Sequence, residues 1–103
     1  MLLAVSIGNT NTAFALFDPE ARKQIRAGRG EGAKDVFRLR TDRDRPADEW
    51  AALLYSSLAA RNISAKQIRN AVQASVVPVV APRVFEAVQT TLGHAPVQVT
   101  ALE

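Results

Sequence analysis

The sequence predicts an α/β domain in which helices pack on a mixed five-stranded sheet. Three observations lead to this prediction. Short apolar runs typical of strands occur near both ends of the chain, two segments between them space large apolar residues as a helix does, and turn-forming residues separate most of these elements. The expected order is β-β-β-α-β-α-β. Helical crossovers make the later strand pairings parallel, whereas the hairpin at the start is antiparallel.

The first two expected strands form a hairpin. Residues 2–7 are a nearly continuous apolar run, which is typical of a strand buried on both faces. Residues 8–11 have the sequence Gly-Asn-Thr-Asn, and these residue types favour turns. Residues 12–17 are again apolar and rich in strand formers, and Asp18-Pro19 closes this second strand.

A long loop and an edge strand are expected next. Residues 20–34 contain three glycines and five basic residues without periodicity, which indicates a long, mobile loop. From Val36 to Thr41 the side chains alternate, which predicts a half-exposed strand. Outward arginines would protect such an edge from pairing with another chain. One face is expected to hold Phe37, Leu39 and Thr41, and the other Arg38 and Arg40.

The first helix is expected from about residue 47 to residue 61. Pro46 suits the first turn of a helix, and Asp48 and Glu49 follow where the helix dipole favours acids. Its apolar face is expected to carry Trp50, Leu53, Leu54 and Leu58.

The last third of the chain supplies a capped turn, a strand, a helix and a short strand. Residues 64–67 resemble a capping box. Residues 71–77 indicate a buried strand that Pro78 stops, and residues 82–92 a helix that ends at Gly93. The apolar face of this helix is expected to carry Val84, Phe85, Val88 and Leu92, and the last strand Val97 and Val99.

Composition limits the class of protein. A chain of 103 residues with 48% hydrophobic and 22% charged residues is expected to form one soluble domain over residues 1–103. No apolar run approaches the ~20 residues that span a bilayer, and no basic segment precedes the first apolar run. The absence of cysteine excludes disulfides and thiolate chemistry within these residues. We therefore expect a cytoplasmic protein without a membrane partner.

The net charge of +3 is unevenly distributed, because nine of the thirteen basic residues lie between Arg22 and Arg45. Such a segment could attract polyphosphate or nucleic acid. The alternative is a solvated loop followed by an edge strand. We favour this alternative, because no aromatic residue that could stack on a base interrupts the charges of residues 22–34.

The candidate binding motif is the segment from Val5 to Thr12. Gly8 allows the backbone to approach a ligand closely, and consecutive turn amides can form a concave anion site. Asparagine and threonine side chains add neutral donors. The alternative is an ordinary asparagine-rich hairpin turn, and this segment alone does not decide between the two.

Two further segments favour the first interpretation. An apolar strand, Gly-Asn-Thr-Asn and a second strand together resemble the first phosphate motif of the acetate-and-sugar-kinase and actin superfamily. More narrowly, residues 7–12 with 14–18 resemble the opening of type III pantothenate kinases. Residues 40–43 leading to Ala47-Asp48-Glu49-Trp50, and Ala74-Ser75-Val76-Val77-Pro78, resemble later segments of the same family in the same order.

This resemblance implies the ribonuclease H-like amino-terminal half-domain of an enzyme that phosphorylates pantothenate with ATP, the first step of coenzyme A synthesis. It implies Mg²⁺, a monovalent cation (K⁺ or NH₄⁺) and a homodimer. The ATP phosphates would bind at Ser6, Gly8, Asn9, Thr10, Asn11 and Thr12. Candidates for the substrate pocket are Ser75, Val76 and Val77.

Two departures from the family pattern predict that the isolated chain is inactive. Ser6 stands where the family has an aspartate that helps hold the metal, and losing such a partner typically costs about 10–100-fold. The family's catalytic base is expected beyond Glu103, together with a carboxy-terminal half-domain. We interpret His94 as a surface histidine. The nearby acids are interpreted as loop and helix-start charges: Asp42, Asp44, Asp48 and Glu49.

Three hypotheses follow. The chain is one half of a pantothenate kinase, a non-catalytic paralogue that binds a nucleotide or a partner (for example an accessory transcription factor), or a structural domain without a ligand. The faces that normally meet the second half-domain and the dimer partner are expected to leave valine and leucine side chains uncovered, which predicts self-association.

Overall fold

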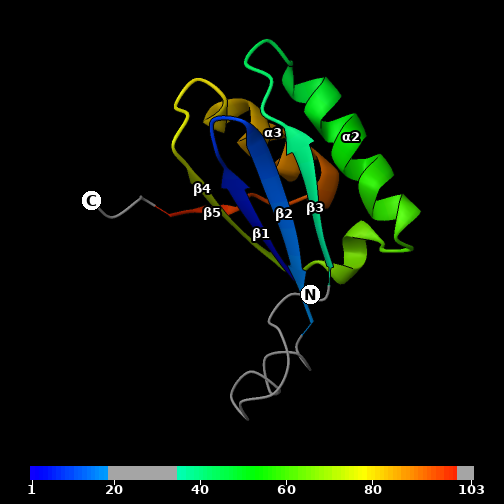
Figure 1. Cartoon of the computed structure of the whole chain (residues 1–103). Coiled ribbons are helices and arrows are strands. Elements are labelled where there is room, and N and C mark those ends of the chain that lie inside the picture. The colour runs from blue at the N-terminus through cyan, green and yellow to red at the C-terminus, as the bar shows by residue number, and fades with distance from the viewer. Residues whose placement is uncertain (19–34, 100–103) are drawn as a thin grey trace.

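The computed structural model describes residues 1–18 and 35–99, and it confirms the predicted α/β class and the order of the elements. The expected loop at residues 20–34 lies outside the described residues. The elements are β1 Leu2–Ile7, β2 Asn11–Phe17, β3 Asp35–Arg40, α2 Ala47–Ala60, the 3₁₀ turn η1 Ala65–Gln67, β4 Asn70–Ser75, α3 Ala81–Leu92 and β5 Val97–Gln98 (Figure 1).

The five strands form one mixed sheet in the order β3-β2-β1-β4-β5. β2 is antiparallel to both of its neighbours, whereas β1 is parallel to β4 and β4 to β5. Four strands therefore run in one direction, and their carboxyl ends meet at one edge of the sheet. We call this edge the carboxyl edge. It holds the β1–β2 turn, the β3–α2 loop and the β4–α3 turn.

The core lies between one face of the sheet and the helices α2 and α3, which both cover that face (Figure 1). Every second side chain along each strand points toward the helices, and these side chains form the sheet side of the core. Because Val5 pairs with Phe14, and Phe14 with Phe37, these three side chains lie on the same face. The helices contribute Trp50, Leu54, Leu58, Val84, Ala87 and Val88. Leu53 and Phe85, which helical spacing placed on the core faces, are only half-buried.

The other face of the sheet carries no helix in the described part of the chain, and we call it the open face. This corrects the expectation that β1 is buried on both sides: Leu3, Val5 and Ile7 are buried, but Ser6 is exposed. The reason is that both crossover helices pack on the same face. The strand registers place Leu2, Ala4, Ser6, Ala13, Ala15, Phe17, Val36, Arg38, Arg40, Val72, Ala74 and Val97 on the open face.

Residues at or next to their ends determine where the helices and strands begin and stop. Pro46 is the N-cap of α2 rather than part of its first turn, and Gly93 ends α3 with φ of 83°. The capping box at Ser64 forms as expected. β4 ends at Ser75 and not at Val77. No helix among the residues that the structure describes is long and apolar enough to cross a membrane.

Candidate phosphate-binding site at the carboxyl edge

The β1–β2 turn projects from the carboxyl edge. The backbone N–H of Gly8 donates to the carbonyl oxygen of Asn11 over 3.0 Å and closes the turn. A Cβ atom on residue 8 would lie 3.1 Å from that oxygen, so glycine suits this tight position. The side chains of Asn9, Thr10 and Asn11 are exposed. The turn therefore presents neutral hydrogen-bonding side chains to solvent around a compact backbone, whereas the N–H of Gly8 is used within the turn.

The β3–α2 loop holds this turn in place. The N–H of Thr41 donates to the carbonyl oxygen of Thr10 over 2.9 Å. Below it, the hydroxyl groups of Thr12 and Thr41 are 2.8 Å apart and buried. The structure thus brings together two segments that are some 30 residues apart in the sequence, and both belong to the motif series identified above.

The β4–α3 turn lies on the other side of β1. The N–H of Val76 donates to the carbonyl oxygen of Ile7 over 3.0 Å. The Ser75 hydroxyl accepts from the N–H of Val77 and donates to its carbonyl oxygen, which turns the chain away from the sheet and ends β4 early. Of the three substrate-pocket candidates, Val76 is 61% exposed, Val77 belongs to the core and the hydroxyl of Ser75 serves the turn.

Ser6 lies on the open face of β1, flanked by Ala13 and Ala74, and is exposed. Its neutral hydroxyl supplies no charge for a metal ion. Among residues 1–18 and 35–99 there is no group of three or more histidine, cysteine, aspartate or glutamate side chains that could hold one. The described residues thus show no cluster of protein ligands for a metal ion, and no step proposed below depends on a metal ion.

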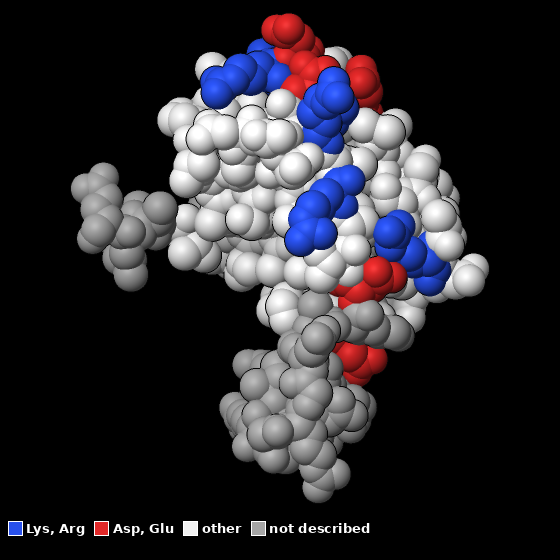
Figure 2. Space-filling model, in the orientation of Figure 1, with Lys and Arg blue, Asp and Glu red and all other residues white. Residues whose placement is uncertain are grey.

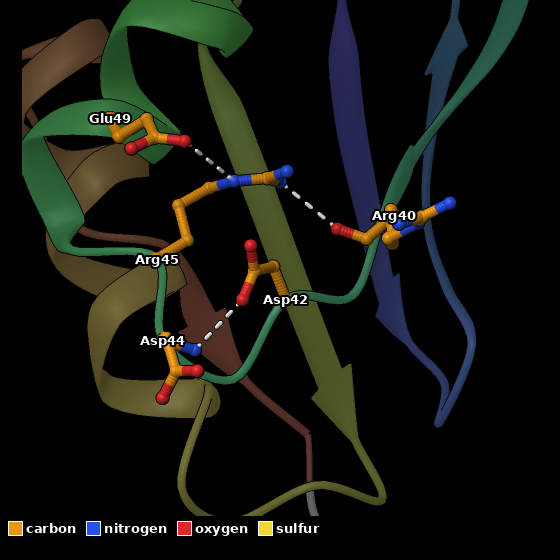
Figure 3. A network of polar contacts seen from close by, with 5 residues as sticks. All are labelled: Arg40, Asp42, Asp44, Arg45 and Glu49. Atoms are coloured by element: carbon orange, nitrogen blue, oxygen red, sulfur yellow. Dashed lines mark hydrogen bonds and ion pairs between the residues drawn. The ribbon is translucent and has the colours of Figure 1, made fainter.

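The acids near the turn have structural contacts. Asp42 accepts a hydrogen bond from the N–H of Asp44 over 2.9 Å, and Glu49 pairs with Arg45 over 3.3 Å (Figure 3). His94 is half-buried, with Nε2 3.1 Å from the carbonyl oxygen of Ile68, rather than a free surface residue. Acidic and basic side chains gather at the end of the molecule that holds the β3–α2 loop (Figure 2).

Sequence reasoning did not single out Arg45. Its side chain, only 11% exposed, reaches from the β3–α2 loop to the end of β3 and covers the ring of Trp50. The four-residue spacing from Arg45 to Glu49, at a helix start, is the signal that could have identified it.

The profile of the family described as "Type III pantothenate kinase" matches residues 2–103. The chain belongs to this family. A type III pantothenate kinase of Moorella thermoacetica is 32% identical over 93% of this chain and 34% of its own length. Those of Rhodospirillum rubrum and Desulfosudis oleivorans are each 38% identical, over 76% and 84% of this chain. The chain spans about a third or less of the length of these type III pantothenate kinases.

Proposed function

We propose that residues 1–103 are the ATP-phosphate-binding half-domain of a type III pantothenate kinase. The observation that carries the proposal is the β1–β2 turn, whose polar side chains are exposed while backbone hydrogen bonds tie Thr10 to the β3–α2 loop and Ile7, just before the turn, to the β4–α3 turn. A turn held on both sides is preorganised, so binding costs little ordering of the backbone. Family membership supports ATP as the ligand.

In this proposal the turn positions ATP and does not perform proton transfer. Phosphoryl transfer depends mainly on positioning and on stabilising charge. The γ-phosphoryl group would pass from ATP to a hydroxyl oxygen of pantothenate, leaving ADP, and the hydroxyl proton would go to a base outside residues 1–103. Val76, exposed beside the turn, is the candidate contact for the carbon chain of pantothenate. Mg²⁺ and the monovalent cation implied by the family would depend on groups beyond those described.

We further propose that the rest of the longer family protein covers the open face. A sheet with helices on one side leaves apolar area in water unless another layer covers it. The matched relatives are much longer than this chain, since it aligns with only 34% and 26% of two of them, so such a layer is available in them. The isolated chain would then be inactive, although its turn would still be formed.

Calorimetric titration of Mg·ATP into the chain tests the phosphate site. We expect Asn9→Ala and Asn11→Ala to weaken binding, because each removes exposed hydrogen-bonding groups of the turn. Asn70→Ala is the matched control, since Asn70 is also an exposed asparagine but lies at the opposite edge of the sheet. Equal effects of all three substitutions, or no binding to the parent chain, would contradict the proposal.

A reconstitution experiment tests whether this chain can act as one half of an active kinase. The carboxy-terminal part of the Moorella thermoacetica enzyme would be mixed with this chain and with its Ser6→Asp variant, and ATP-dependent phosphorylation of pantothenate measured. Turnover that is greater with Ser6→Asp is the expected result. Mg·ATP binding without turnover in either mixture would favour the non-catalytic hypothesis instead.

A further inference from the structure

We propose that Arg45 is a positioning residue for the phosphate-binding turn, acting through the peptide group between Arg40 and Thr41. This inference rests on the proposed function of the turn. It concerns a side chain that does not touch the turn itself.

Three contacts hold the guanidinium group of Arg45, and Figure 3 shows two of them, those with Arg40 and Glu49. Its Nη1 donates to the carbonyl oxygen of Arg40 over 2.9 Å, and its Nε lies 3.3 Å from a carboxylate oxygen of Glu49. Its central carbon lies 4.5 Å from the centroid of the Trp50 ring, which is buried. A planar cation can make these contacts together, because a guanidinium presents donors in its plane and a face to the ring.

The Arg40–Thr41 peptide group is therefore bound at both ends. Its oxygen accepts from Arg45, and its N–H donates to the carbonyl oxygen of Thr10 in the turn, over 2.9 Å. A charged donor on a carbonyl oxygen polarises the amide, so the N–H of the same group becomes a stronger donor. Arg45 thus strengthens the hydrogen bond that fixes the turn as well as holding the loop.

Arg61 provides a natural comparison at the other end of β3. Its guanidinium carbon also lies 4.5 Å from a ring centroid, that of Phe37, and its Nε lies 3.2 Å from Asp35. Its Nη1 donates to the carbonyl oxygen of Ser57 within α2. The two arginines make the same three kinds of contact, but only the carbonyl group held by Arg45 belongs to a peptide that contacts the turn.

Amide hydrogen exchange and proton shifts, measured by NMR, test the inference in Arg45→Lys and Arg61→Lys. Lysine keeps the charge but loses the planar fork. We expect the Thr41 N–H to exchange about tenfold faster in Arg45→Lys, with an upfield shift of its proton, as expected when a charge-assisted hydrogen bond is weakened. In Arg61→Lys the same amide should change by less than about twofold. The Val5 N–H in the centre of the sheet reports global unfolding.

Three outcomes would overturn the inference: no change at Thr41, equal changes in both variants, or acceleration at Thr41 that Val5 matches. Arg45→Gln, which retains side-chain donors without the charge, gives a second readout if the lysine variant folds poorly. Mg·ATP titration adds a functional readout, with weaker binding expected for Arg45→Lys only. If the parent chain binds no Mg·ATP, the proposed function fails, and the exchange measurement still decides the role of Arg45.

Discussion

The hydroxyl groups of Thr12 and Thr41 meet beneath the β1–β2 turn. Thr12 is fully buried and Thr41 nearly so, and their oxygen atoms are 2.8 Å apart. Each hydroxyl is a satisfied polar group only because the other is present. A buried hydroxyl without a partner destabilises the fold by more than the hydrogen-bonded pair stabilises it. The reason is that the hydrogen bonds the hydroxyl made with water in the unfolded chain are then not replaced.

This asymmetry predicts a strongly non-additive pair of substitutions. Thr12→Val and Thr41→Val should each lower the free energy of unfolding by about 1 to 2 kcal/mol, because each leaves one buried hydroxyl unpaired. The double variant should be close to the parent chain, since valine has nearly the shape of threonine. Urea denaturation of the four proteins measures the coupling. Additive losses would show that the hydroxyls do not depend on each other.

At the level of the elements, the end of α3 determines the direction in which the chain continues toward β5. Gly93 has φ of 83°, and its N–H donates to the carbonyl oxygen of Gln89 over 2.8 Å. After this left-handed residue the chain passes His94 and returns to the sheet as β5. An added Cβ on Gly93 would meet no atom within 4 Å. Glycine is therefore favoured here by its backbone conformation and not by lack of space.

Gly93→Ala should destabilise the chain by about 1 kcal/mol, the cost of placing an L-residue in the left-handed region. Gly93→Asn should cost less, because asparagine tolerates that conformation better than other residues with a side chain. Thermal or urea unfolding checks the order of the three proteins. If alanine proved no worse than glycine, the conformation at the end of α3 would have to differ from that described.

For the whole molecule, the main feature is the open face. Uncharged side chains cover most of the sheet in Figure 2, with basic side chains toward the β3 side. Small and apolar residues occupy the central strands there, among them Ala4, Ala13 and Ala15. Exposed apolar area of this kind usually meets another layer or another molecule.

We therefore expect the isolated chain to self-associate at high concentration. Ala15→Glu should shift sedimentation toward monomer, because a carboxylate in the middle of the open face is costly to bury in a contact between copies. Ala52→Glu, on the exposed side of α2, is the matched control and should leave association unchanged. A parent chain that sediments as a monomer at every concentration would contradict the expectation.

Local patterns in the sequence determined most of the secondary-structure elements of this protein. Apolar runs, the Gly-Asn-Thr-Asn turn, the capping box at Ser64 and the stop at Gly93 predicted the elements and their order, because each depends on neighbouring residues. The motif series likewise identified the family, which the match over residues 2–103 confirms.

The tertiary structure decided what depends on distant residues. Only the packing of both helices on one face leaves Ser6 exposed on a strand whose composition suggested burial on both sides. Only the closeness of the β3–α2 loop to the turn connects Arg45 to Thr10, through a single peptide group. These hydrogen bonds, and the exposure of Ser6 on the open face, depend on the order and packing of the strands and helices. The spacing of residues along the chain does not reveal that arrangement.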